Sequence, residues 1–114
     1  MLTLEKLRAF GANVEEGMNR CMNNEAFYLK LVGMVLPDEK LNDLEVALQQ
    51  QNLDRAFEIA HSLKGMYGNL ALTPICKPVI EMTELLRNRT QTDYSALLHE
   101  AQAQKQKLNA LAQD

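Results

Sequence analysis

Apolar residues recur every three or four positions along almost the whole chain, and the strict alternation typical of β-strands is nowhere sustained. The 114 residues include only five glycines and three prolines, so the breaks between the periodic segments are short. Short connections make neighbouring helices run antiparallel. The pattern therefore predicts an all-α antiparallel bundle, formed as a single domain over residues 1–114 around one modest core.

The helices are expected to begin and end at local signals. The predicted segments are residues 3–10, a short helix after Asn13, residues 25–36, a helix after Asp38, residues 53–71, a helix from Thr73, and a last helix capped by Thr92 or Asp93. Asn13, Asn24 and Asn52 are suited to accept hydrogen bonds from the first free N–H groups of a helix.

The helix that follows residue 71 contains two prolines. Thr73-Pro74 is typical of an N-cap followed by a proline at the first helical position. Pro78 would remove a hydrogen bond four residues later, which predicts that the helix starts late or bends there. The expected buried line of this helix is Ile75, Val79, Met82 and Leu86.

Composition and charge exclude several classes of function. The net charge of −3 and the absence of a basic stretch make nucleic acid an unsuitable partner. No apolar run approaches the ~18 residues that a membrane span requires, and the N-terminus lacks the apolar core of a signal peptide. Cys21 and Cys76 fit no metal-binding spacing, and buried free thiols in a reducing compartment are expected. We therefore expect a cytoplasmic protein.

The longest helix, residues 53–71, has two distinct faces. With His61 at 0° on a helical wheel, the broad side holds Leu53, Ala56, Ala60, Leu63, Tyr67 and Leu70, and is extended by Ile59 and Met66. The narrow opposite arc holds Asp54, Glu58, His61, Gly65, Gly68 and Asn69. His61 is therefore expected near the centre of the exposed face, with Lys64 about 60° away and one turn along.

Two glycines share this exposed arc with His61. A glycine inside a helix costs about 1 kcal/mol relative to alanine, so Gly65 and Gly68 need a reason to be there. One reason is that the backbone of another molecule approaches His61 across a surface free of side chains. Contact with a neighbouring helix, or fraying of the helix near Gly68, are structural alternatives.

Lys64 stands three residues after His61 and can reach the same space. Its ammonium disfavours a second positive charge on the imidazole, which keeps the ring nucleophilic, and it would stabilise an anion attached to the ring. No second His, Asp or Cys is spaced to complete a metal site or a catalytic triad. A simply solvated surface histidine is the alternative on geometry alone.

The run Ala60-His61-Ser62-Leu63-Lys64-Gly65, followed by Asn69-Leu70, resembles the signature of histidine phosphotransfer (HPt) domains of two-component phosphorelays. The family pattern is roughly Ala-His-x-Leu-Lys-Gly, then small residues, then Leu-Gly. The segments 14–17 and 25–28 also look like the N-terminal part of this family. The resemblance covers the chain from about residue 13 to its end.

This resemblance implies an up-down bundle of four antiparallel helices, with one or two short helices over one end. His61 would be phosphorylated on Nε2, Lys64 would steady the phosphoryl group, and Gly65 would leave room for the partner. The implied partner is a receiver domain of a response regulator, or of a hybrid histidine kinase, and it would supply the Mg²⁺. The chain itself would carry no cofactor and no kinase or phosphatase activity. Phe57 is a candidate for partner contact, with core packing as its alternative.

The sequence departs from the family pattern at two positions. Ala71 replaces the usual glycine, which affects how the helix ends. Thr83 stands where the family often has a longer polar side chain that fixes the imidazole, with Arg87 one turn later. His99 matches no motif and is expected to be an ordinary surface histidine.

Two other functions are consistent with the sequence. The chain could be a helical adaptor that binds a receiver without being phosphorylated, although retention of both His61 and Lys64 argues against that. It could also be the phosphoacceptor domain of a chemotaxis-type kinase. The presence of Met1 and of a full set of helices favours a free-standing protein, and we expect it to be a monomer.

Overall fold

The computed structural model describes residues 1–113, and Asp114, the last residue of the predicted domain, lies outside them. The regular elements within this range are all helices. They are α1 (Leu4–Phe10), α2 (Val14–Arg20), α3 (Glu25–Val35), α4 (Lys40–Gln49), α5 (Leu53–Asn69), α6 (Thr73–Arg87) and α7 (Ser95–Leu111). The prediction of an all-α fold is confirmed.

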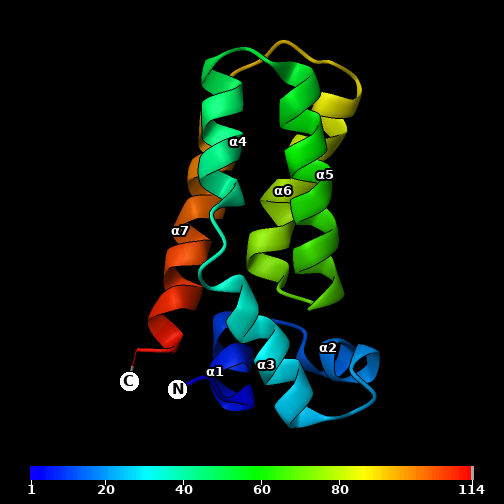
Figure 1. Cartoon of the computed structure of the whole chain (residues 1–114), viewed down its shortest axis with the longest axis vertical. Helices are drawn as coiled ribbons and strands as arrows, with labels where there is room; N and C mark the ends of the chain where they lie inside the picture. The colour runs from blue at the N-terminus through cyan, green and yellow to red at the C-terminus, as the bar shows by residue number, and fades with distance from the viewer. Residues whose placement is uncertain (114) are drawn as a thin grey trace.

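Helices α4 to α7 form an antiparallel four-helix bundle, and α1 to α3 cover one end of it (Figure 1). Helix α5 contacts α4 and α6, α6 contacts α7, and α7 returns to α4. The covering layer contains three helices rather than one or two. Gly11 in a left-handed conformation separates α1 from α2, and the Asn24 cap starts α3 anew, so each segment is a separate helix.

The buried side chains form one hydrophobic cluster that extends from the bundle into the covering helices. Leu7 of α1, Val14 of α2 and Tyr28 of α3 are fully buried in it, as is Leu63 of α5. The expected buried line of α6 is confirmed, since Ile75, Val79, Met82 and Leu86 are all buried. The covering helices and the bundle therefore share a core.

The predicted asparagine caps are confirmed. The side chains of Asn13, Asn24 and Asn52 each accept a hydrogen bond, at 3.1–3.2 Å, from the backbone N–H three residues later. Asp38 and Asp93 each stand one position before the N-cap residue. Each carboxylate accepts a hydrogen bond of 2.9 Å from the backbone N–H two residues later. As a result α4 begins at Lys40 and α7 at Ser95.

The expectations for the start of α6 and the end of α5 are wrong in detail. Helix α6 begins at Thr73 itself, with Leu72 as its N-cap, and runs on through Pro78 without a late start. Pro78 removes only the bond to the Pro74 carbonyl, and the burial of both flanks of the helix outweighs that loss. Helix α5 ends at Asn69 rather than at residue 71.

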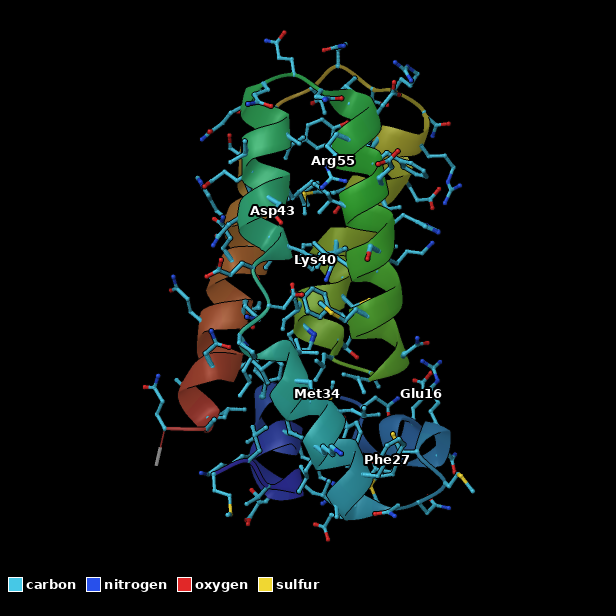
Figure 2. The ribbon with its side chains drawn as sticks, viewed as in Figure 1. Glu16, Phe27, Met34, Lys40, Asp43 and Arg55 are labelled. Atoms are coloured by element: carbon cyan, nitrogen blue, oxygen red, sulfur yellow. The ribbon has the colours of Figure 1, made fainter. Side chains whose placement is uncertain are left out.

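Most side chains on the outside of the molecule are polar or charged, as Lys40, Asp43 and Arg55 illustrate (Figure 2). Phe27 and Met34 on α3 are apolar exceptions, with 45% and 64% of their surface exposed.

Lys105 of α7 is a charged residue that is largely buried, and its Nζ donates a hydrogen bond of 2.8 Å to the Leu36 carbonyl. It thereby ties α7 to the link between α3 and α4. Within residues 1–113, no helix is both long enough and apolar enough to cross a membrane.

Candidate functional site

His61 lies on the exposed face of α5, about halfway along the helix, as predicted. Its neighbours Ala60 and Leu63 are fully buried, whereas Glu58 and Gly65 on the same arc as His61 are exposed. Among residues 1–113, no side chain or backbone group hydrogen-bonds to the imidazole of His61. Both ring nitrogens are therefore available to a partner.

An aromatic ring supports one side of this histidine. The Phe57 and His61 rings stack with their centroids 5.7 Å apart and their planes inclined by 20°. The Arg87 guanidinium of α6 lies 5.2 Å from the centroid of the same Phe57 ring. Phe57 is half-buried and packs against the core, so it is both a core residue and the immediate neighbour of the imidazole. Phe57 and Arg87 thus both lie at the site that the sequence predicted.

Lys64 lies one turn from His61 and belongs to a small ionic cluster. Its Nζ is 3.9 Å from Oε1 of Glu84 on α6, and Oε2 of the same carboxylate is 3.4 Å from Nε of Arg87. Glu84 was not foreseen from the sequence. Its i, i+3 spacing from Arg87 is visible there, but its pairing with Lys64 depends on how α5 and α6 pack.

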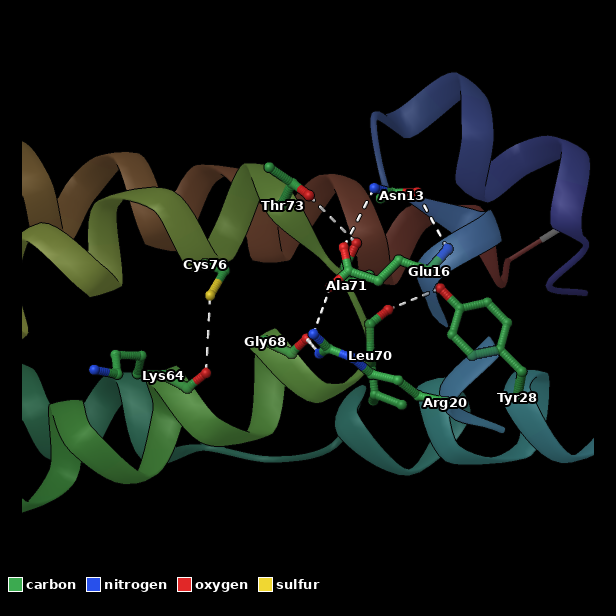
Figure 3. A network of polar contacts seen from close by, with 10 residues as sticks. All are labelled: Asn13, Glu16, Arg20, Tyr28, Lys64, Gly68, Leu70, Ala71, Thr73 and Cys76. Carbon is green, nitrogen blue, oxygen red and sulfur yellow. Dashed lines mark hydrogen bonds and ion pairs between the residues drawn. The ribbon is translucent and has the colours of Figure 1, made fainter. Parts of the chain in front are cut away.

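The two glycines near His61 have different surroundings. A Cβ added at Gly65 would meet no atom within 4 Å, so the surface there is open. A Cβ at Gly68 would lie 3.7 Å from the Cys76 sulfur, an ordinary contact with α6. The Gly68 carbonyl accepts from the Arg20 guanidinium and, at 3.0 Å, from the Ala71 N–H (Figure 3). Gly68 is thus a packed and bonded position rather than a frayed end.

A shallow hollow of about 380 Å³ adjoins this part of α5. It is lined by Lys64, Gly65, Gly68 and Ile80, and by Glu16 and Arg20 from α2. Ile80 is 44% exposed and gives the hollow an apolar edge. Ile80 could have been found in the sequence, because it is an apolar residue outside the expected buried line of α6. Arg20 offered no such signal, because it reaches the hollow only through the packing of α2 on the bundle.

Thr83 does not bond to the imidazole. Its side chain is fully buried, and its hydroxyl donates to the Val79 carbonyl of its own helix at 2.7 Å. A threonine hydroxyl within a helix commonly bonds back to the carbonyl four residues earlier, and this short side chain reaches no further. Of the two residues expected behind His61, Arg87 therefore contacts the Phe57 ring beside the imidazole, whereas the hydroxyl of Thr83 is bonded within its own helix.

The remaining residues considered in the sequence are one histidine and two cysteines. His99 is exposed on α7, as expected for a surface histidine. Cys21 and Cys76 are free and buried, and burial raises the pKa of the Cys76 thiol. The part of the chain that the structure describes contains no group of three or more His, Cys, Asp or Glu side chains placed to hold a metal ion.

This arrangement presents an accessible imidazole with a cation one turn along and a bare backbone beside it. Such a site can accept a small anionic group on a ring nitrogen and neutralise part of its charge.

A family model described as the Hpt domain matches residues 38–114, which include the whole of α4 to α7. The resembling segments 14–17 and 25–28 lie outside that match. Comparison with curated proteins and with solved structures gives no match.

Proposed function

The chain belongs to the Hpt domain family, and from that premise we propose that it is a phosphoryl carrier in which His61 is the phosphoacceptor. In this role His61 receives a phosphoryl group from an aspartyl phosphate of one receiver domain and passes it to another. The observation that carries the proposal is the exposed His61 imidazole, with the Lys64 ammonium one turn along and the open backbone of Gly65 beside it.

The transfer is an in-line displacement at phosphorus. The lone pair of His61 Nε2 forms the P–N bond, and the P–O bond to the aspartate breaks with its electron pair left on the carboxylate. The proton on Nδ1 stays on the ring, so charge balances without an external acid or base. Such transfer depends on positioning and charge neutralisation, which suits a chain with no nucleotide motif.

Three neighbours of His61 have separate roles in this proposal. Lys64 neutralises part of the phosphoryl charge, because its ammonium is one turn from the imidazole. The exposed side of Phe57 and the apolar edge at Ile80 contact the receiver on either side of His61, and Gly65 lets the receiver's backbone come close. Arg87 holds the Phe57 ring through its cation–π contact. Gly68 contributes less to clearance than Gly65, because it already packs on Cys76.

The partners follow from the same chemistry. A receiver domain supplies the reacting aspartate and the Mg²⁺, and the donor receiver can be part of a hybrid histidine kinase. The carrier then needs no kinase or phosphatase activity of its own. We place the protein in the cytoplasm as a monomer, where buried free thiols such as Cys21 and Cys76 stay reduced.

The deciding experiment is phosphoryl transfer from a phosphorylated receiver domain to wild type, His61→Gln and His99→Gln. The chain has only two histidines, so His99→Gln is the matched control. We expect label on wild type and on His99→Gln and none on His61→Gln. Equal labelling of His61→Gln would reject the assignment. Receiver binding without label on any variant would instead favour the adaptor function.

A further inference from the structure

Glu84 on α6 lies between two cations of the site, Lys64 and Arg87. One oxygen of its carboxylate lies 3.9 Å from Lys64 Nζ, and the other lies 3.4 Å from Arg87 Nε. The Lys64 side chain is one-third exposed and that of Glu84 about half exposed, so solvent weakens the pair without abolishing it. In the unphosphorylated protein, Lys64 therefore already has an anionic partner.

A phosphoryl group on His61 would need the same ammonium. Phosphorylation adds about −1.5 to −2 charges at neutral pH, together with three strong acceptor oxygens. One ammonium on a flexible stem cannot hold both that group and a carboxylate on the neighbouring helix at full strength.

We propose that Glu84 is a positioning residue that competes with the phosphoryl group for Lys64 and so limits the stability of phosphorylated His61. This inference rests on the proposed function. Pairing with Glu84 holds Lys64 and Arg87 at the site before phosphorylation, and competition after it keeps the phosphoryl group transferable. A carrier that must both accept and release the same group benefits from such a weak hold.

The predicted consequence is a change in the lifetime of the phosphohistidine. The transition state for P–N cleavage is loose, and the phosphoryl group carries less negative charge there than in the ground state. A cation that holds the group therefore stabilises the ground state more than the transition state. Removing Glu84 frees Lys64 for this contact and should slow the loss of the phosphoryl group.

The test uses a receiver-free donor, so that it does not depend on a partner. In a His99→Gln background, phosphoramidate labels His61 as its own P–N bond breaks and ammonia leaves. The half-life of the phosphohistidine in neutral buffer is then compared with and without Glu84→Gln. We expect the half-life to lengthen about twofold to fivefold, the range open to an exposed ion pair.

Two controls make the result specific. Glu81→Gln removes the same charge one turn earlier on the exposed face of α6, and no ion pair joins Glu81 to another residue among residues 1–113, so it should leave the half-life unchanged. In a Lys64→Met background, Glu84→Gln should also have no effect, because the competition acts through Lys64. A purely structural role of Glu84 would appear in the unfolding midpoint rather than in this lifetime.

The possible outcomes separate this inference from the proposed function. An unchanged or shortened half-life in Glu84→Gln, or a lengthening that persists without Lys64, overturns the role of Glu84 and leaves the carrier function standing. Failure of every receiver to label wild type overturns the carrier function, while the receiver-free lifetimes still measure the competition. Failure of both phosphoramidate and every receiver to label His61 overturns both.

Discussion

The hydroxyl of Tyr28 donates a hydrogen bond of 2.8 Å to the Leu70 carbonyl, and this bond joins a covering helix to the end of the helix that carries His61 (Figure 3). Two further bonds reach the same turn from the covering layer. The Asn13 N–H donates to the Ala71 carbonyl at 2.9 Å, and Arg20 donates to the Gly68 carbonyl. The carbonyls of Gly68 at the end of α5, and of Leu70 and Ala71 in the turn after it, thus accept hydrogen bonds from α2, α3 and the segment before α2.

We therefore predict that Tyr28→Phe lowers the free energy of unfolding by about 1–3 kcal/mol, the usual cost of leaving a buried carbonyl unpaired. The ring stays in place against Gly17, so the loss reports on the hydroxyl alone. Urea unfolding followed by circular dichroism measures it. Tyr94→Phe is the control, because its bond to the Thr90 carbonyl is only partly buried. Equal losses for the two variants would contradict a special role for Tyr28.

The same tyrosine makes stability depend on alkaline pH. Burial, with smaller contributions from Cys21 and Glu15, raises the pKa of Tyr28 to about 12. The unfolded chain releases this proton near the ordinary value of about 10, so between the two values the unfolded state holds fewer protons. Stability from Tyr28 is therefore fully present below pH 10 and is lost as pH rises toward 12. The fall in unfolding free energy between pH 8 and pH 11 should be smaller in Tyr28→Phe than in wild type.

Several features that depend on residues close together in the sequence were predicted correctly, whereas contacts between distant helices were not predicted. The caps at Asn13, Asn24 and Asn52 depend only on the next three residues, and all three form. The exposed face around His61 follows from helical spacing alone. The contact of Tyr28 with Leu70, 42 positions apart, depends on how whole helices pack, and no local pattern encodes it.

The errors in the sequence prediction have the same origin. Residues up to 71 continue the apolar pattern of α5, but Ala71 has φ of 55° and turns the chain toward α6. That turn places Leu72, not Thr73, at the N-cap of α6. At the site, His61, Phe57 and Lys64 share one helix and could be placed together in advance, whereas Glu84 and Arg20 arrive from other helices.

Two of the left-handed residues that follow helices, Gln51 and Ala71, give a further prediction. Gln51 follows α4 with φ of 56°, and Ala71 follows α5 with φ of 55°. In both turns the next N–H bonds back to the carbonyl five residues earlier, an arrangement that usually places glycine at the left-handed position. Gln51→Gly should raise the unfolding free energy by about 0.5–1 kcal/mol, since relief of left-handed strain exceeds the entropy lost by glycine.

Ala71→Gly should give a smaller gain, or none. Ala71 is only 6% exposed, so the substitution also removes a buried methyl group worth about 0.8 kcal/mol. Gln51 is exposed and has no such loss. Thermal unfolding of both variants ranks them directly. A larger gain at residue 71 than at residue 51 would show that strain, and not burial, decides the balance there.

Phe57 allows core packing and partner contact to be separated. Phe57→Leu keeps an apolar side chain against the core and should lower stability by no more than about 1.5 kcal/mol. It removes the stack with His61 and the contact with Arg87, so we expect transfer from a receiver to slow about twofold to tenfold. Met66→Leu, another half-buried position of α5 on a different face, is the control. Unchanged transfer in Phe57→Leu would leave Phe57 with packing alone.

Gly65 gives the sharpest test, because its effects on stability and on transfer should have opposite signs. An added Cβ meets nothing within 4 Å, and alanine is favoured over glycine inside a helix by about 1 kcal/mol, so Gly65→Ala should stabilise the protein by that amount. A receiver backbone that approaches His61 across this surface would be displaced by the methyl group. Misplacement by about 1 Å can cost ~100-fold in rate, so transfer should slow by up to that factor.

Gly33→Ala is the matched control for this variant. Gly33 lies inside α3, where an added Cβ also meets nothing within 4 Å, and it lines no part of the hollow beside Gly65. It should gain the same stability and leave transfer unchanged. If Gly65→Ala and Gly33→Ala are stabilised alike and transfer equally well, the bare surface at Gly65 does not serve the partner's approach to His61.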